Sequence, residues 1–355
     1  MSYFVNPFVK QTERVFPDQG RYGFLRYDMN ENPEGLPRDF VDNVLCEITP
    51  EYLAIYPEPS RFIEKYASSV GVESNQVTVT NGTDQAIRYL LQVFCEQGKD
   101  VVTVSPSFEM YWVNCNLLGL NHVPVPYEDD LSFNMDKLIK KITPNTDVVV
   151  LLNPNNPVGD AFSRDEVLTA IECAKQNDAI VIIDEAYHYF YKNTFLDLVN
   201  QFDNVIVLRT FSKLFSLAAC RLGVIVSNPD IIHYVNNLKL TFDVNAIALK
   251  FGEHLLDHPE LKDMLIATER EGRDWFVNTL SEHGYSMQRC EGNFVFVKTN
   301  HKAADVAQRL KERGILVKYW TSGVLSDYLR VSTGSKPAME KVAAAILELD
   351  SSAEG

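Results

Sequence analysis

Hydrophobic residues in the middle of the chain form short unbroken runs that do not alternate with polar residues. VVVLL (148–152) and AIVIID (179–184) are two such runs. Strands without alternation are buried on both faces, as in a parallel sheet that is covered by helices. Runs of this kind predict strands at Gln76–Thr80, Val101–Val104, Asp147–Leu152, Ala179–Asp184, Val205–Arg209 and Leu222–Val226.

The segments between these runs have the apolar spacing of helices. Asp84–Gln97, Arg164–Gln176 and Phe195–Asn200 are predicted to be helices or helical turns. Strands that alternate with helices are typical of an α/β fold with a mostly parallel sheet.

The pattern changes from about Asn245 onward. A long helical stretch leads into GNFVFVKT (292–299), which is typical of a strand. The following segments predict a helix, two strands and a final helix, at Lys302–Arg313, Ile315–Tyr319, Leu329–Ser332 and Lys336–Leu349. We therefore expect a large domain (45–245) and a smaller α+β domain that combines residues 1–44 with residues 246–355.

Charge and composition narrow the possible partners. The chain has 33 Lys and Arg against 48 Asp and Glu, a formal net charge of −15. Such an acidic chain repels nucleic acid and anionic membrane surfaces, so neither is an expected partner. Met1–Pro7 lacks the basic start and apolar core of a signal peptide, and the six cysteines form no C-x-x-C pair. A cytoplasmic setting is therefore expected.

A pair of histidines has spacing that can bind a metal ion. His254 and His258 stand four residues apart, with Glu253 and Asp257 beside them. The alternative, a solvated helix face, is favoured because the motif is weak, and we expect no metal site.

Polar residues follow the strands at the edge of the sheet where ligands usually bind. Asn153–Pro157, Asp184–Tyr187 and Thr210–Lys213 each come at or just after a strand end. An earlier strand opens into Asn81–Asp84 at a predicted helix start. Because the carboxyl ends of parallel strands meet at one edge, these amide, carboxylate, phenol, hydroxyl and amine groups should lie close together.

Pyridoxal phosphate needs this combination of groups. Its aldehyde needs a lysine amine, and its ring nitrogen needs a carboxylate that keeps the nitrogen protonated. Its ring oxygen accepts hydrogen bonds from phenol or amide groups. Its phosphate is bound by a helix N-terminus, hydroxyls and a guanidinium.

TFSKLFSLAACRLG (210–223) resembles the cofactor-binding segment of fold-type-I aminotransferases, in which an arginine follows the lysine after eight residues. The closest resemblance is to the histidinol-phosphate aminotransferase family and its relatives, the threonine-phosphate decarboxylases. The resemblance covers nearly the whole chain. Its further segments are MNENPEG (29–35), YPEPSR (56–61), TNGTDQAI (80–87), PSFEMY (106–111), LNPNNPVG (152–159), DEAY (184–187) and YLRVSTG (328–334).

This resemblance implies pyridoxal phosphate as the cofactor and assigns its contacts. Lys213 would hold the aldehyde as a Schiff base and later move protons. Asp184 would pair with the ring nitrogen, and Tyr111 would stack on the ring. Asn156 and Tyr187 would hydrogen-bond the ring oxygen.

The resemblance also implies a phosphate site that two subunits share. Within one chain, the phosphate would be held at Gly82 by the backbone amides of Thr83 and Asp84, joined by Thr210, Ser212 and Arg221. Tyr56 matches a tyrosine that the family sends to this phosphate from the neighbouring subunit, so a homodimer is implied.

Five residues are implied for the substrate. Arg330 matches the arginine that holds the substrate's anionic group, while Tyr22, Asn30 and Asn156 would line the pocket. Lys318 stands where the family often has a second arginine, and an ammonium holds a phosphate only as a point charge.

The activity implied is transamination between glutamate or 2-oxoglutarate and a small phosphorylated amine or amino acid. Decarboxylation of an O-phospho amino acid remains the alternative, because it needs the same groups in a slightly different pocket. A protein that keeps the fold without chemistry is a third alternative, and the intact Lys213, Asp184 and Arg221 argue against it.

Overall fold

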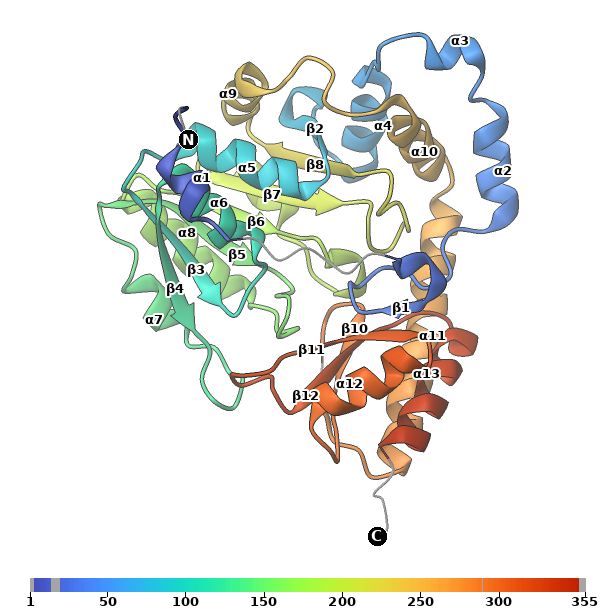
Figure 1. Cartoon of the computed structure of the whole chain (residues 1–355). Coiled ribbons are helices and arrows are strands. Elements are labelled where there is room, and N and C mark those ends of the chain that lie inside the picture. The colour runs from blue at the N-terminus through green and yellow to red at the C-terminus, as the bar shows by residue number, and fades with distance from the viewer. Residues whose placement is uncertain (1–2, 14–19, 289, 351–355) are drawn as a thin grey trace.

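The computed structural model of the chain describes residues 3–13, 20–288 and 290–350, which form two β-sheets surrounded by helices (Figure 1). In this described part, the larger sheet has seven strands in the order β2-β8-β7-β6-β5-β3-β4. They are β2 Val77–Asn81, β3 Asp100–Ser105, β4 Asn121–Pro126, β5 Thr146–Leu152, β6 Ile180–Asp184, β7 Val205–Thr210 and β8 Leu222–Ser227.

The smaller sheet has five strands within the described residues, in the order β1-β11-β12-β10-β9. They are β1 Leu25–Tyr27, β9 Met287–Gln288, β10 Phe294–Lys298, β11 Ile315–Tyr319 and β12 Tyr328–Ser332. The amino-terminal strand β1 pairs with β11, so this part of the early chain packs against the carboxyl-terminal part.

Helices cover both sheets (Figure 1). The α-helices are α1 Pro7–Gln11, α2 Arg38–Cys46, α3 Pro50–Leu53, α4 Ser60–Val70, α5 Thr83–Phe94, α6 Met110–Leu118, α7 Met135–Ile139, α8 Arg164–Gln176, α9 Pro229–Leu238, α10 Ala246–Asp257, α11 Pro259–Glu282, α12 Ala303–Glu312 and α13 Lys336–Leu349. The 3₁₀ helices are η1 Arg21–Gly23, η2 Ser74–Gln76, η3 His188–Phe190 and η4 Leu196–Asn200. Among the described residues, no helix is both long and apolar enough to cross a bilayer.

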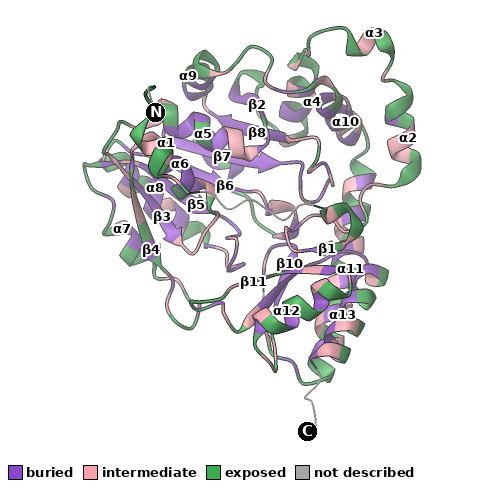
Figure 2. Cartoon of the chain, viewed as in Figure 1, coloured by how far each residue is buried: buried purple, intermediate pink, exposed green. Residues whose placement is uncertain are grey.

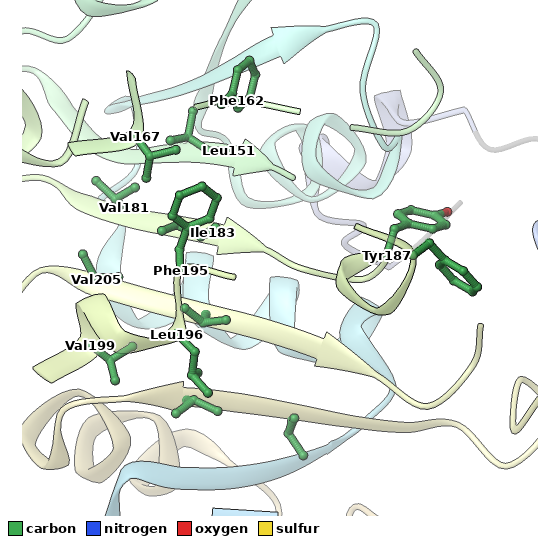
Figure 3. Close-up of a cluster of buried hydrophobic side chains, with 14 of the residues drawn as sticks. Leu151, Phe162, Val167, Val181, Ile183, Tyr187, Phe195, Leu196, Val199 and Val205 are labelled. Carbon is green, nitrogen blue, oxygen red and sulfur yellow. The ribbon is translucent and has the colours of Figure 1, made fainter. Parts of the chain in front are cut away.

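The predicted strands of the large sheet are confirmed, each within one residue at either end. Their side chains alternate between two separate cores. In β5, Val149 and Leu151 belong to one apolar cluster and Val148 and Val150 to another. Figure 3 shows the first cluster, which includes Leu151 and Ile183. Burial on both faces explains why the strands have no polar alternation.

One strand of the large sheet runs against the others. Strand β8 is antiparallel to both β2 and β7, and the remaining neighbours are parallel to each other. Strand β2 therefore points the same way as β7. This orientation places Arg221, just before β8, at the same edge as the residues that follow β2 and β7.

The sequence pattern missed strand β4. Pro124 and Pro126 lie in this strand, and prolines in a short run indicate a loop. Strand β4 is at the end of the sheet and pairs with β3 alone. A proline is tolerated there because an edge strand does not use all of its N–H groups.

The stretch after Asn245 contains two helices. Asn245 caps α10, which ends at Asp257, and Pro259 begins α11. Helix α10 packs against α4, whereas α11 lies beside α13 on the small sheet (Figure 1). Short α1 contacts α6, beside the large sheet. The division into domains at residues 45 and 245 stays a prediction.

Burial follows the two sheets. Figure 2 shows the strands of the large sheet mainly in purple, while α2 and α3 are mostly exposed. A second core, which includes Tyr27, Phe276 and Val331, lies between the small sheet and helices α11 and α13.

The contact between α11 and the start of α13 depends on a glycine. A Cβ atom on Gly272 would lie 2.0 Å from the carbonyl oxygen of Gly334, closer than atoms can pack. We expect Gly272→Ala to destabilise the protein by about 1 to 3 kcal/mol, because the helix must move away. Denaturant unfolding would measure this change.

Gly23→Ala is the control, because a Cβ there meets no atom within 4 Å and the backbone is unstrained. It should change the free energy of unfolding by less than about 0.5 kcal/mol. Equal stability of the two variants would contradict the packing argument.

Candidate active site

The predicted site residues meet at the carboxyl edge of the large sheet. Asp184 ends β6, Thr210 ends β7, and Gly82 caps α5 just after β2. Lys213 and Arg221 lie in the loop that joins β7 to β8. The edge therefore combines an acid, an amine, a guanidinium and a helix start.

Asp184 is the last residue of β6, at this edge of the sheet. Its side chain is buried, with the residue only 2% exposed. Oδ1 accepts a hydrogen bond from the Ala186 N–H at 3.1 Å, and Oδ2 accepts one from the Tyr111 hydroxyl at 2.8 Å. Burial raises the pKa of Asp184 to about 6, although the Tyr111 hydrogen bond opposes this shift.

Lys213 contacts the amino-terminal segment of the chain. Its Nζ donates a hydrogen bond to the Met29 carbonyl oxygen at 2.8 Å and lies 5.8 Å from the centre of the Tyr187 ring. The next residue, Asn30, donates from Nδ2 to the Tyr187 hydroxyl at 3.0 Å. Asn30 itself is held by Ser332, whose Oγ accepts from the Asn30 N–H at 2.8 Å. Segments more than 300 residues apart thus meet beside Lys213.

The start of α5 and Arg221 form a cradle for an anion. Arg221 Nη2 lies 2.9 Å from Asp84 Oδ2. A Cβ atom on Gly82 would lie 2.4 Å from the same Nη2, so a glycine is required for this close approach. A Cβ on Gly223 would lie 2.8 Å from the Thr83 nitrogen. The N-terminus of α5 and the Arg221 guanidinium therefore lie next to each other, an arrangement that suits a phosphate.

Two hydroxyl residues lie where β7 ends and the loop to β8 begins. Thr210 and Ser212 are both buried, and Thr210 Oγ1 accepts a hydrogen bond from the Ser212 N–H at 3.1 Å. Thr210 pairs directly with Gly223 in the sheet, which ties it to the base of the same loop.

Arg330 connects the small sheet to the large one. It is buried, its Nη1 donates to Asn156 Oδ1, and its Nη2 donates to the Asp28 carbonyl oxygen at 2.7 Å. Among the described side chains, its Nε is one of the buried atoms without a hydrogen-bond partner. Burial lowers the pKa of Arg330. A buried guanidinium with a spare donor is suited to bind an anion.

Lys318 lies directly opposite Arg330 in the antiparallel β11–β12 pair, so both side chains project from the same face. Trp320 lies close to both cations. Its ring centre is 5.8 Å from Lys318 Nζ and 5.7 Å from Arg330 Cζ. The structure thus places two positive charges beside one aromatic ring.

Two predicted residues lie outside this group. Tyr22 is 97% exposed, and Tyr56 is 72% exposed and stacks on Phe242 with ring centres 4.3 Å apart. A single chain does not bury either residue in the site.

The two histidines four residues apart have separate partners. His254 Nε2 lies 3.1 Å from Glu47, and His258 Nδ1 lies 2.8 Å from Glu260.

A buried ion pair behind Asp184 was missed by the sequence analysis. Arg209 Nε donates to Glu185 Oε2 at 2.9 Å, and both side chains are almost fully buried. Glu185 also accepts from the Phe195 N–H at 2.6 Å. The detectable signal was an arginine in the otherwise apolar run VIVLRT (205–210), since an unpaired buried charge is costly.

The residues present fit pyridoxal phosphate. Lys213 offers an amine for its aldehyde, Asp184 a buried acid for its ring nitrogen, and the Gly82–Arg221 cradle a site for its phosphate. The fold and this arrangement agree with a pyridoxal-phosphate enzyme of fold type I, the class that the family match shows.

Comparison with known proteins identifies the family. A family model described as aminotransferase class I and II matches residues 48–346. The chain therefore belongs to the aminotransferase class I and II family and is a pyridoxal-phosphate-dependent aminotransferase.

Individual relatives agree with this family. Histidinol-phosphate aminotransferase of Thermoanaerobacter pseudethanolicus is 33% identical over 332 residues, 91% of this chain and 92% of that protein. Histidinol-phosphate aminotransferase of Sinorhizobium meliloti, solved with pyridoxal-5'-phosphate, has a TM-score of 0.87 at 21% identity and covers 98% of both chains. L-threonine-O-3-phosphate decarboxylase of Porphyromonas gingivalis has a TM-score of 0.77 at 22% identity and covers 91% of this chain and 98% of that chain. At these identities, the two structures support the fold alone.

The raised pKa of Asp184 predicts that the acid destabilises the cofactor-free protein at neutral pH. The pKa is about 6 when folded, against an ordinary value of 3.8. The folded state therefore binds the proton more tightly, so this group's contribution to stability falls as the pH rises from about 4 to about 6. Above that range the loss is about 2 to 3 kcal/mol.

We expect cofactor-free Asp184→Asn to be more stable than the wild type at pH 7.5 by about 2 kcal/mol. This gain should shrink at pH 4.5, where the wild-type acid is protonated. Urea unfolding of both proteins at the two pH values measures the difference. A gain independent of pH would contradict the raised pKa.

Proposed function

We propose that this enzyme moves an amino group between glutamate or 2-oxoglutarate and a small phosphorylated amine or amino acid. The observation that carries the substrate class is the pair of cations on one face of the small sheet. Lys318 and Arg330 lie opposite each other, and Trp320 lies within 5.8 Å of both. A phosphate carries up to two negative charges and is suited to two nearby cations. The name of the relative from Thermoanaerobacter pseudethanolicus supports the same class.

Lys213 is the proposed catalytic residue. Bound pyridoxal phosphate supplies an aldehyde that an amine can hold and a ring that takes up the electrons of a broken bond at the substrate's α-carbon. Lys213 Nζ would bind this aldehyde and, after the substrate amine replaces it, would carry the proton from the α-carbon. The Met29 carbonyl orients Nζ by accepting its hydrogen bond.

The other polar residues bind and orient the cofactor in this proposal. Asp184 would hold the proton on the ring nitrogen, and Tyr111 would stack on the ring. Asn156 and Tyr187 would donate hydrogen bonds to the ring oxygen. The phosphate would be held at Gly82 by the backbone N–H groups of Thr83 and Asp84, together with Thr210, Ser212 and Arg221.

For the substrate, Arg330 would bind the carboxylate of glutamate and the anionic group of the second substrate in turn. Asn30 and Tyr22 would line the same pocket. Asn156 already contacts Arg330, so it would orient the guanidinium as well as the cofactor.

We also propose a homodimer in which Tyr56 reaches the partner's phosphate site. Exposed apolar residues support this proposal, namely Leu53 and Ile55 next to Tyr56 in the chain, Phe242 stacked on Tyr56, and Leu240 two residues before Phe242. A contiguous apolar surface is typical of a protein interface. A cytoplasmic location is proposed as well, on the strength of six free cysteines.

The assignment of Lys213 is tested by Lys213→Ala. Purified wild-type enzyme should show the visible absorbance of lysine-bound pyridoxal phosphate, and glutamate should convert it to the pyridoxamine form. The variant should lack this absorbance, because no amine remains to bind the aldehyde. Lys137→Ala, a surface variant whose lysine pairs with Glu128, is the control.

A Lys213→Ala protein that kept the lysine-type absorbance would refute the assignment. The reaction type is tested separately with phosphoserine and phosphothreonine. Release of carbon dioxide without amino transfer would favour the decarboxylase alternative over the transaminase.

The headgroup role of Lys318 gives a second prediction. Lys318→Ala should raise the KM for a phosphorylated substrate, such as histidinol phosphate, by about tenfold, the effect of losing one charge-assisted hydrogen bond. The KM for glutamate should change by less than about twofold, because Arg330 remains. Steady-state kinetics with each substrate would measure both values.

Lys298→Ala is the control, since Lys298 lies on the same sheet beside Asp327. If Lys318→Ala affected both substrates equally, the lysine would have no special role in binding the phosphate.

A further inference from the structure

Tyr111 makes a contact that stacking on a cofactor ring does not require. The residue is the second of α6, it is 1% exposed, and its ring lies in an apolar cluster with Ile182. Its hydroxyl donates to Asp184 Oδ2 at 2.8 Å. The ring alone would suffice for stacking, so the hydroxyl needs a separate explanation.

The hydroxyl completes the orientation of Asp184. The Ala186 N–H binds Oδ1 at 3.1 Å and Tyr111 binds Oδ2, so each carboxylate oxygen has one donor. A carboxylate has about four lone-pair positions, so Asp184 can still accept a further hydrogen bond. These two hydrogen bonds therefore orient the Asp184 carboxylate and leave it able to accept another hydrogen bond, from the ring nitrogen of the cofactor.

The surroundings of Asp184 otherwise favour its neutral form. Burial raises its pKa most, and the negative charges of Asp84 and Glu185 raise it further. Each of these neighbours has its own cation, Arg221 for Asp84 and Arg209 for Glu185. In the described part of the chain, Tyr111 supplies the side-chain hydrogen bond to Asp184 that favours the charged form.

The phenol is suited to this role. Burial and the charge of Asp184 raise the pKa of Tyr111 well above its ordinary value. The hydroxyl therefore keeps its proton over the whole physiological range and always acts as a donor towards Asp184.

We propose that the Tyr111 hydroxyl is a positioning group, distinct from the Tyr111 ring, that holds Asp184 as an oriented carboxylate for the protonated ring nitrogen of the cofactor. This inference rests on the proposed function, in which Asp184 binds that nitrogen. Tyr111 acts through Asp184 in this respect and touches no reacting atom with its hydroxyl.

Tyr111→Phe tests the proposal, because it removes the hydroxyl and keeps the ring. The dissociation constant of pyridoxal phosphate is measured from its absorbance at pH values from about 5.5 to about 8.5. A carboxyl group with a pKa near 6 loses its proton within roughly this range. At neutral pH we expect affinity to fall about tenfold, the effect of losing one hydrogen bond to a charged group. The loss of affinity at low pH should also move to higher pH, because Asp184 becomes easier to protonate.

Tyr89→Phe is a matched control. Tyr89 is a buried tyrosine whose hydroxyl also donates to an aspartate, Asp243, at 3.1 Å, away from Asp184. Tyr89→Phe, like Tyr111→Phe, loses one buried hydrogen bond, so both variants should lose similar stability. The pH dependence of cofactor binding should stay as in the wild type for Tyr89→Phe. In an Asp184→Asn background, Tyr111→Phe should have no further effect on the pH profile, because the two residues act as one unit.

A wild-type pH profile for Tyr111→Phe would overturn the proposal, and so would a shift that persists in the Asp184→Asn background. Failure of the proposed function has a different signature. In that case, the wild-type enzyme would not take up pyridoxal phosphate on Lys213, whatever residue stands at position 111.

Discussion

The structure depends on keeping one acid, Asp184, buried at the end of a hydrophobic strand. Water would stabilise this carboxylate better than the protein interior does, and burial raises its pKa to about 6. The protein offsets part of this cost with the Tyr111 hydroxyl and the Ala186 N–H. In the proposed site, the positively charged ring nitrogen of the cofactor would offset the rest. The site is thus built to be complete with its cofactor and less stable without it.

Much of the fold could be predicted from the sequence, because the strands of the large sheet are buried on both faces and have no polar interruptions. The prediction failed where this signal is weak. Strand β4 contains prolines that only an edge strand tolerates, and β1 is three residues long and pairs with a strand about 290 positions away. The reversed direction of β8 was not predicted either, although the connection of residues 211–221 is shorter than a usual parallel crossover.

The candidate site could be predicted as a set of side chains but not as a set of contacts. Lys213 and Asp184 stand at or just after predicted strand ends, and Arg221 was assigned from the family resemblance. The structure brings all three to one edge. The Met29 carbonyl that binds Lys213 is a backbone group, and a sequence pattern does not indicate which backbone groups a side chain contacts. The Tyr111 hydroxyl reaches Asp184 from a different helix, so no spacing along the chain reveals it. Tyr22 and Tyr56 are exposed in the single chain, and only Tyr56 is proposed to reach a site in a partner subunit.

The antiparallel pairing of β7 and β8 has a consequence for how the enzyme can vary. Since Thr210 pairs with Gly223, the segment between them is a closed return loop that carries both Lys213 and Arg221. If Lys213 binds the aldehyde and Arg221 the phosphate, as proposed, their separation would have to match the length of the cofactor. A residue inserted into this loop would move Lys213 relative to Arg221, whereas insertions elsewhere on the surface would not. In the proposed site, changes of substrate range would therefore be tolerated more readily in the small sheet, which carries Lys318 and Arg330, than in this loop.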